Sequence, residues 1–420
     1  MDSSDIADGI LPDTVPVHIG RRVTGYRAWH KVRKQFVRKH QWNELIKQLV
    51  NADWRSTLQK PSDAVKVPPN STMHVSEPLR CLVIPGDDLL DIRSLWNVIS
   101  PLDCYIRYLG FNEVQGSQDE GTRVFVANNA VTSLPGVISD SQVLRDRFES
   151  IARESPGFAQ LKRYGPYHVV NLDLCGSLMP NNHKPVEPYI TAINRLLSYQ
   201  FANQKTSWLF FVVTMVEPAM ANAAEMARLC IPTRKNYDSN PAFAEAVASL
   251  FPASVLKAPD RDAEVTGISE EEMIRLFGVA FGKWLLHLSH SASPEWTVRM
   301  RQIHRYQVDE NAGAVMLSLA FQFKPNFAPP VDPTGISTLS VLQSNFPSEA
   351  EMAVKVAQVV GAIRDVDEEL AAKGELRQQL QNESADLMES AGYDRTDYLK
   401  WVAEGELSDR QQLLKEQTDK

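Results

Sequence analysis

Residues 167–180, Y-H-V-V-N-L-D-L-C-G-S-L-M-P, decide the fold that this sequence predicts. The stretch begins with apolar and β-branched residues, passes through one acidic residue, Asp173, and breaks at Gly176 and Ser177. A mainly apolar run that ends in a turn signal is typical of a strand buried on both faces, as in a parallel sheet covered by helices. In such sheets, functional groups lie just past the carboxyl ends of the strands. We therefore expect the chemistry of this protein near Asp173.

Apolar runs and helical periods alternate on both sides of this stretch. Strands are expected at 79–85, 104–111, 124–127 and 208–216, and helices at 89–99, 143–152, 186–201 and 219–229. This alternation predicts an α/β fold with a doubly wound, mostly parallel sheet. Two later apolar runs, 296–306 and 314–323, are separated by the turn signal D-E-N-A-G and predict a C-terminal antiparallel hairpin. A capping-box pattern, S-E-E-E from Ser269, predicts the start of a helix before this hairpin.

Two proline-rich segments, 58–78 and 325–333, predict breaks in the chain. They divide it into a basic N-terminal helical segment (1–75), a Rossmann-like domain (76–330) and a charged C-terminal helical region (331–420). The C-terminal region has few large apolar residues between 364 and 390, which favours an exposed helix or a coiled pair that contacts a protein partner. A solvated helix without a partner fits this pattern equally well.

Composition excludes several classes of protein. The 420 residues carry a net charge of -8, which argues against a globally basic nucleic-acid binder. No apolar run approaches the roughly 20 residues that span a bilayer, and the acidic N-terminus lacks the pattern of a signal peptide. The four cysteines are scattered, and His287-x-x-His290 has no evident third ligand, so no metal site is predicted. These features favour a cytoplasmic protein without a membrane partner.

The segment 21–43 is the most basic part of the chain, with eight Lys or Arg residues, two histidines and no acid. Its apolar residues recur at helical spacing, and several aromatic residues are interleaved with the charges. One hypothesis is a helix that binds nucleic-acid phosphates while the aromatic rings stack on bases. The alternative is an amphipathic helix whose aromatic rings pack on the body and whose charges are solvated or paired. The residues assigned to nucleic acid under the first hypothesis are Arg27, Lys31, Arg33, Lys34, Arg38 and Lys39.

Five predicted parallel strands followed by an antiparallel hairpin are the layout of class I S-adenosylmethionine-dependent methyltransferases, and residues 79–323 resemble that superfamily. The motif N-L-D-L-C-G-S at 171–177 is similar to the fourth-strand motif D-P-F-G-S of RNA methyltransferases such as the tRNA guanine dimethyltransferases. It also resembles the D-P-x-G form in three-Cys-motif partner proteins, which are found in bacterial mobile and defence gene neighbourhoods. The resemblance implies S-adenosylmethionine as the cofactor and nucleic acid as the substrate.

The resemblance also implies roles for individual residues. Asp173 would contact the reacting amine or the methionine end of the cofactor, and Ser177 would shape the catalytic pocket. Glu113, at the end of the second strand, would bind the ribose hydroxyls, since a carboxylate can accept both hydrogen bonds. The other residues that the resemblance assigns to the cofactor are Gly86, Asp87, Asn128, Asn129 and Gly176.

The loop after the first strand departs from the family pattern. The superfamily form is G-x-G-x-G, but here the sequence is I-P-G-D-D-L-L-D-I, with Gly86 as its single glycine. Proline is also missing from the fourth-strand motif. These departures keep a second hypothesis open, a catalytically silent Rossmann-like subunit of a multiprotein assembly with a role in bacterial phage defence.

Overall fold

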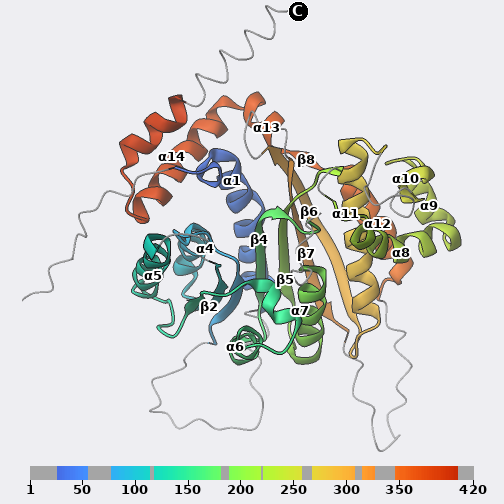
Figure 1. Ribbon diagram of the computed structural model, residues 1–420, viewed down its shortest axis with the longest axis horizontal. Helices are drawn as coiled ribbons and strands as arrows, with labels where there is room; N and C mark the ends of the chain where they lie inside the picture. The colour runs from blue at the N-terminus through green and yellow to red at the C-terminus, as the bar shows by residue number, and fades with distance from the viewer. Residues whose placement is uncertain are drawn as a thin grey trace, which may run out of the picture.

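The computed structural model describes residues 26–54, 77–113, 118–180, 189–218, 221–257, 267–307, 315–326 and 346–404. Among these residues, eight strands form one sheet in the order β3-β2-β1-β4-β5-β7-β6-β8 (Figure 1). Their bounds are β1 (Leu79–Val83), β2 (Ile106–Phe111), β3 (Gln142–Leu144), β4 (Val169–Ser177), β5 (Trp208–Met215), β6 (Trp296–Gln307), β7 (Val315–Pro325) and β8 (Arg364–Asp365).

The sheet is mostly parallel. Strand β7 runs antiparallel to both of its neighbours, β5 and β6, whereas every other pairing among the described strands is parallel. The prediction of an α/β fold with a mostly parallel sheet is therefore confirmed, and so is the antiparallel pairing of β6 with β7, although β8 and not this pair forms the edge of the sheet. The D-E-N-A-G turn of that hairpin lies outside the described residues.

Helices cover both faces of the sheet, and alternate residues of each strand face opposite layers. In β1, Leu82 belongs to the core on one face, while Cys81 and Val83 belong to the core on the other. The first face carries α6 (Pro156–Tyr164), α7 (Tyr189–Asn203), α8 (Ala223–Ser239), α9 (Pro241–Ala248), α10 (Ala253–Lys257), α11 (Glu270–His290) and α12 (Glu349–Gly361). The second carries α1 (Val32–Val37), α2 (Glu44–Gln48), α4 (Leu90–Ile99), α5 (Gln118–Thr132), α13 (Val366–Ala372) and α14 (Gly374–Ser390).

The basic N-terminal segment packs on the sheet as part of the second layer. Helix α1 continues into a π-helical turn, η2 (Arg38–Asn43), and then into α2. Phe36 and Trp42, which are 0% and 3% exposed, belong to the same core cluster as residues of β1, β2 and β5. The apolar stripe predicted in this segment is thus buried against the body. The predicted boundaries at 75/76 and 330/331 fall in segments outside the described residues.

Two predicted elements are wrong. Residues 124–127, predicted as a strand, lie inside α5, and residues 143–152, predicted as a helix, contain most of β3 and the 3-10 helix Phe148–Ala152. An apolar run of four residues cannot distinguish a strand from a helix by periodicity. In α5, Val124 is buried but Phe125 is 64% exposed, as neighbouring positions on a helix can be. The capping box at Ser269 is confirmed, because Ser269 and Glu272 bond reciprocally at the start of α11.

Helix α14 is not the exposed helix that the sequence predicts. It contacts α1 and α4, and Leu380, Leu387 and Met388 are each less than 5% exposed. Figure 1 shows α14 and α13 lying over α1 at one end of the molecule. In the part of the chain that the structure describes, no helix combines the length and apolarity needed to cross a membrane.

Candidate functional site

A cavity of about 420 Å³ lies at the carboxyl ends of β1, β2 and β4. Strands β1 and β4 are neighbours, and the chain order reverses between them, so the cavity occupies the topological switch point where open α/β sheets bind ligands. Its volume is within the range of small-molecule sites. Residues at the strand ends line it together with Trp29, Arg33 and Lys34 of the N-terminal segment.

Asp173 and Lys34 form a buried ion pair in this cavity. The Lys34 ammonium donates a hydrogen bond to Asp173 Oδ1 and another, of 3.3 Å, to the Tyr306 hydroxyl. Lys34 is only 4% exposed, and its Nζ lies 4.9 Å from the centroid of the Trp42 ring. Burial is the largest influence on Lys34 and opposes its charge, but Asp173, Tyr306 and Asp91 together outweigh burial and raise the pKa of Lys34. Burial raises the pKa of Asp173, an effect that Lys34 opposes.

Asp88, in the loop after β1, connects four parts of the chain at the edge of the cavity. Its carboxylate accepts hydrogen bonds from Arg123 Nε (2.9 Å) and from the Tyr393 hydroxyl (2.9 Å), and it lies 3.4 Å from His30 Nε2. Burial raises the pKa of Asp88, but the contacts with His30 and Arg123 outweigh burial, so the net shift is downward. This Asp88 junction ties the β1–α4 loop to α5, to the N-terminal segment and to the chain after α14.

The residues predicted to hold the cofactor at the ends of β1 and β2 do meet in the cavity. Gly86, Asp87 and Glu113 all line it. Asn112 Nδ2 connects the two loops by donating to Pro85 O (2.9 Å) and to Asp87 Oδ1 (3.4 Å). Glu113 forms an ion pair with Arg147, in which both side chains are about one-third to two-fifths exposed. Among the described residues, Asp87 has no ion-pair partner.

Four other predicted site residues lie elsewhere. Asn128 and Asn129 belong to α5, where Asn128 Oδ1 accepts a hydrogen bond from the Tyr108 hydroxyl (2.8 Å), because the strand expected before them is a helix. Gly176 and Ser177 do not line the cavity. The register of β4 against β5 shifts between Asp173 and Ser177, and such bulges change the direction of the side chains that follow.

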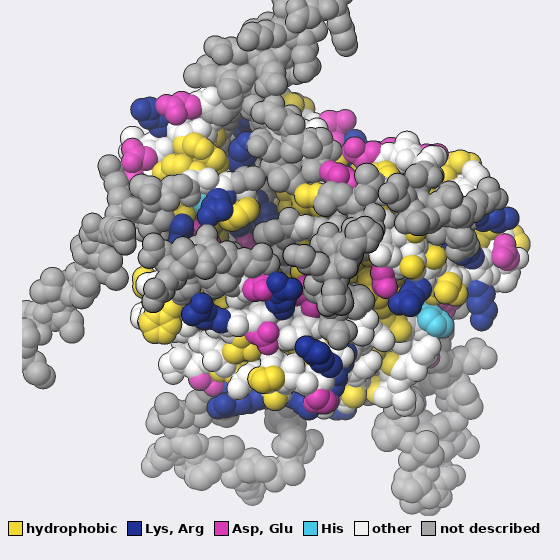
Figure 2. All heavy atoms as spheres, viewed as in Figure 1, with side chains coloured by type: hydrophobic (Ala, Val, Ile, Leu, Met, Phe, Trp, Pro, Cys, Tyr) yellow, Lys and Arg dark blue, Asp and Glu magenta, His cyan; other side chains and the backbone are white. Residues whose placement is uncertain are grey.

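The basic residues of the N-terminal segment mostly pair with carboxylates of the body. Arg33 pairs with Asp367, Arg38 with Asp91 and Lys39 with Glu383. Arg38 is 4% exposed, while Arg27 is exposed with its guanidinium 5.6 Å from the Trp29 ring centroid, and Lys31 is half-buried. On the face seen in Figure 2, Lys and Arg side chains are scattered among Asp, Glu and uncharged side chains over the visible described residues. Binding of phosphates by Arg33, Arg38 or Lys39 would require these ion pairs to open.

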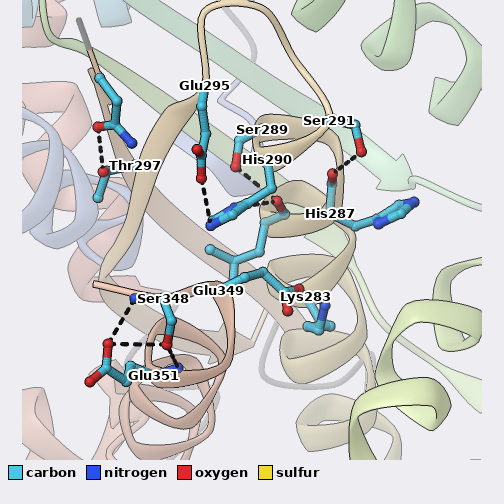
Figure 3. Close-up of polar contacts among 12 residues, drawn as sticks. Lys283, His287, Ser289, His290, Ser291, Glu295, Thr297, Ser348, Glu349 and Glu351 are labelled. Carbon is cyan, nitrogen blue, oxygen red and sulfur yellow. Dashed lines mark hydrogen bonds and ion pairs between the residues drawn. The ribbon is translucent and has the colours of Figure 1, made fainter. Parts of the chain in front are cut away.

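In the His287-x-x-His290 pair, the His290 ring is held by contacts within the chain, whereas His287 is exposed. Figure 3 shows the two imidazole rings pointing away from each other, with His290 directed toward Glu295. His290 Nε2 lies 3.2 Å from Glu295 Oε1, and its Nδ1 lies 3.0 Å from the Leu286 carbonyl oxygen. One turn earlier, Lys283 pairs with Glu349 of α12. Within the described ranges, no group of three His, Cys, Asp or Glu side chains could hold a metal ion.

Sequence reasoning missed the residues that reach the cavity from outside the predicted strand ends. Tyr306 at the end of β6 and Trp29 before α1 both line it. A Cβ added to Gly86 would lie 3.7 Å from Trp29 Nε1, so this indole packs beside the glycine. The interleaved aromatic and basic residues of 21–43 were the one sequence signal for the contribution of this segment. That pattern does not identify which residues of the body they contact.

A family model described as PP_RS20740-like matches residues 23–403. The chain belongs to the PP_RS20740-like family. The PP_RS20740-like match includes the N-terminal helix and α14 together with the whole sheet. The matched region therefore contains every element that lines the cavity. None of the curated proteins matches the chain.

Proposed function

We propose that the chain binds a nucleoside cofactor of the S-adenosylmethionine type in this cavity and is a methyltransferase-like protein. One observation carries the proposal: Gly86, Asp87 and Glu113 from the ends of β1 and β2 meet Asp173 of β4 in a single cavity. The strand order β3-β2-β1-β4-β5 and the helices on both faces support a doubly wound arrangement, a type of fold in which nucleotides commonly bind at the carboxyl ends of the strands.

Glu113 is suited to hold the ribose. A carboxylate offers enough acceptor positions for two hydroxyl groups, and its ion pair with Arg147 is partly exposed, so solvent screening keeps that pair weak. Asp87 is suited to a cationic group of the ligand, because its carboxylate has no ion-pair partner among the described residues. Methyl transfer from a sulfonium needs a positioned acceptor and a base for its proton more than it needs covalent chemistry.

Nucleic acid is the proposed substrate, and phosphate contacts would come from the basic residues nearest the surface. Arg27 is exposed, and Lys31 is half-buried at the start of α1. They flank Trp29, which lines the cavity. A nucleic-acid strand that passes over Trp29 would therefore reach the cavity from the side of the basic segment.

A second candidate, a catalytically silent Rossmann-like subunit, is favoured by the Lys34–Asp173 pair. Lys34 already neutralises the carboxylate that would accept the proton from the reacting group. A buried ion pair of this kind resists exchange with a ligand, because breaking it leaves an uncompensated charge. Under this reading, the cavity binds a nucleoside ligand without chemistry.

Calorimetry with S-adenosylmethionine and with S-adenosylhomocysteine tests the proposal. The wild-type chain is expected to bind both ligands, and Glu113→Gln is expected to weaken binding by about tenfold or more, since one of the two acceptor oxygens and the negative charge are lost. The matched control is Glu154→Gln, which removes another carboxylate paired with an arginine, Arg195, outside the cavity. Absence of binding at millimolar ligand would remove the methyltransferase proposal. Binding without methyl transfer to any nucleic acid would favour the second candidate.

A further inference from the structure

The Lys34 ammonium sits in surroundings that would recognise any primary ammonium. It contacts one carboxylate, Asp173, and one phenol hydroxyl, Tyr306. The rings of Trp42 and Tyr306 lie with their centroids 4.9 Å and 5.9 Å from Nζ, close enough for a cation–π attraction. An ammonium group has three hydrogen-bond donors and one compact charge, so a carboxylate, a hydroxyl and aromatic faces together satisfy it.

These recognising groups come from elements that are held in place without Lys34. Asp173 is on β4 and Tyr306 is on β6, so the sheet fixes both. The Trp42 ring, 3% exposed, packs against Phe211 of β5 at a centroid distance of 6.3 Å. A side chain truncated at position 34 would therefore leave a preformed pocket.

The pocket opens to the cavity. Lys34, Asp173 and Tyr306 all line the same 420 Å³ space. The neighbouring Asp91 carboxylate is already paired with Arg38 at 2.8 Å, so Asp173 is the carboxylate that Lys34 neutralises. Lys34 bonds Asp173 Oδ1, so a ligand amine that takes this position must displace the Lys34 side chain.

We propose that the Asp173 end of the cavity is a binding site for a primary ammonium group and that Lys34 occupies it as an internal ligand. Lys34 is then the residue that determines specificity at this end, because it excludes ligand amines while it is bound. The inference shares its cavity with the proposed function but does not depend on the identity of the cofactor. The ligand class is a primary alkylammonium ion, such as the end of a lysine side chain or of an aliphatic amine.

The test is chemical rescue of Lys34→Ala by n-propylammonium, which replaces the three lost methylenes and the nitrogen. The melting temperature of Lys34→Ala is expected to rise saturably with n-propylammonium chloride, by about 3 °C or more beyond the rise in wild type. Propan-1-ol and sodium chloride at equal concentration are expected to give no such difference. The measurement contains no S-adenosylmethionine, so its failure and the failure of cofactor binding are separate results.

Three variants keep the outcome interpretable. Lys34→Met fills the space and is expected to show no rescue, and Lys39→Ala, which removes a surface-facing lysine paired with Glu383, is expected to behave as wild type. If Lys34→Ala does not fold alone, n-propylammonium is expected to increase its refolded yield, whereas propan-1-ol is not. The double variant Lys34→Ala/Asp173→Asn removes the charge that binds the amine and is expected to lose the rescue. Rescue by propan-1-ol as strong as by n-propylammonium, or rescue that survives Asp173→Asn, would overturn the ammonium site.

Discussion

The ion pair between Lys34 and Asp173 makes each residue costly to replace alone. Removing the lysine leaves a buried carboxylate without a partner, which typically destabilises a protein by about 3–5 kcal/mol. We expect Lys34→Met to lose stability in that range in urea unfolding, and Lys34→Met/Asp173→Asn to recover a large part of it. Equal losses in the single and double variants would contradict a coupled pair.

Buried histidines predict how stability depends on pH. Burial lowers the pKa of His168 to about 3, and the charge of Arg80 contributes. The unfolded chain binds this proton near pH 6.5 and the folded chain only near pH 3, so the stability that neutral His168 contributes falls as pH drops through that window. The expected slope from this residue is about 1.4 kcal/mol per pH unit at most.

Urea unfolding at pH 7, 6 and 5 measures that slope. His168→Asn keeps an acceptor for the Arg80 backbone N–H, which donates to His168 Nδ1 at 3.0 Å, but has no proton to bind. The variant is expected to lose less stability between pH 7 and 5 than wild type does. A slope unchanged by the substitution would show that His168 does not titrate on unfolding.

The position of Asp173 could be predicted from sequence, but its partner could not. A strand pattern followed by a glycine places an acidic residue at the edge of a sheet from local information alone. Lys34 is 139 positions away, and no periodicity encodes a contact at that separation. For the same reason the sequence left two hypotheses open for the basic segment, and in the structure Arg33, Lys34, Arg38 and Lys39 are paired with carboxylates of the body.

Helices α11 and α12 approach closely at two glycines on one face of α11. A Cβ added to Gly282 would lie 2.7 Å from Val356 Cγ1, and one added to Gly278 would lie 3.0 Å from Val360 Cγ2. We expect Gly282→Ala to lower the free energy of unfolding by about 1–3 kcal/mol through overpacking, despite the better helix propensity of alanine. The measurement is urea unfolding.

Gly374 in α14 is the matched control, because nothing lies within 4 Å of a Cβ added there. Gly374→Ala is expected to leave stability unchanged or to raise it by up to about 1 kcal/mol. If Gly282→Ala were as stable as Gly374→Ala, α11 and α12 could move apart to accept the added methyl group without a loss of folding free energy.

Elements with long, consistent patterns were predicted well, and short ones were not. The apolar runs of β4 and β5 and the capping box of α11 each gave the correct element. The run at 124–127 was too short to exclude a helix. Because it was predicted as a strand, Asn128 and Asn129 were wrongly expected at the cavity. The bulge after Asp173 depends on how β4 pairs with β5, so the sequence of β4 alone could not reveal that Gly176 and Ser177 lie outside the cavity.

At the scale of the molecule, the proposed contact with nucleic acid predicts binding that depends on salt. Affinity for single-stranded RNA or DNA is expected to fall steeply with salt concentration, and Arg27→Glu/Lys31→Glu is expected to reduce the log–log slope by about one to two. These positions are preferred to Lys34 and Arg38, whose reversal would disrupt buried ion pairs. Lys162→Glu, on the opposite layer, is the control. Binding that is absent or independent of salt would leave the segment with a packing role alone.

The Asp88 junction gives the molecule an optical reporter of its own cavity. Tyr393 bonds to Asp88 and stacks on Tyr26 at 5.5 Å, and Tyr26 stacks in turn on Trp401 at 4.8 Å. A ligand that binds the Asp88 carboxylate would weaken its hydrogen bond to Tyr393. The stacking of Tyr393, Tyr26 and Trp401 would then loosen, and the polarity around the Trp401 indole would change. Because the chain has eight tryptophans, the difference in emission between wild type and Trp401→Phe should register occupancy without any added dye.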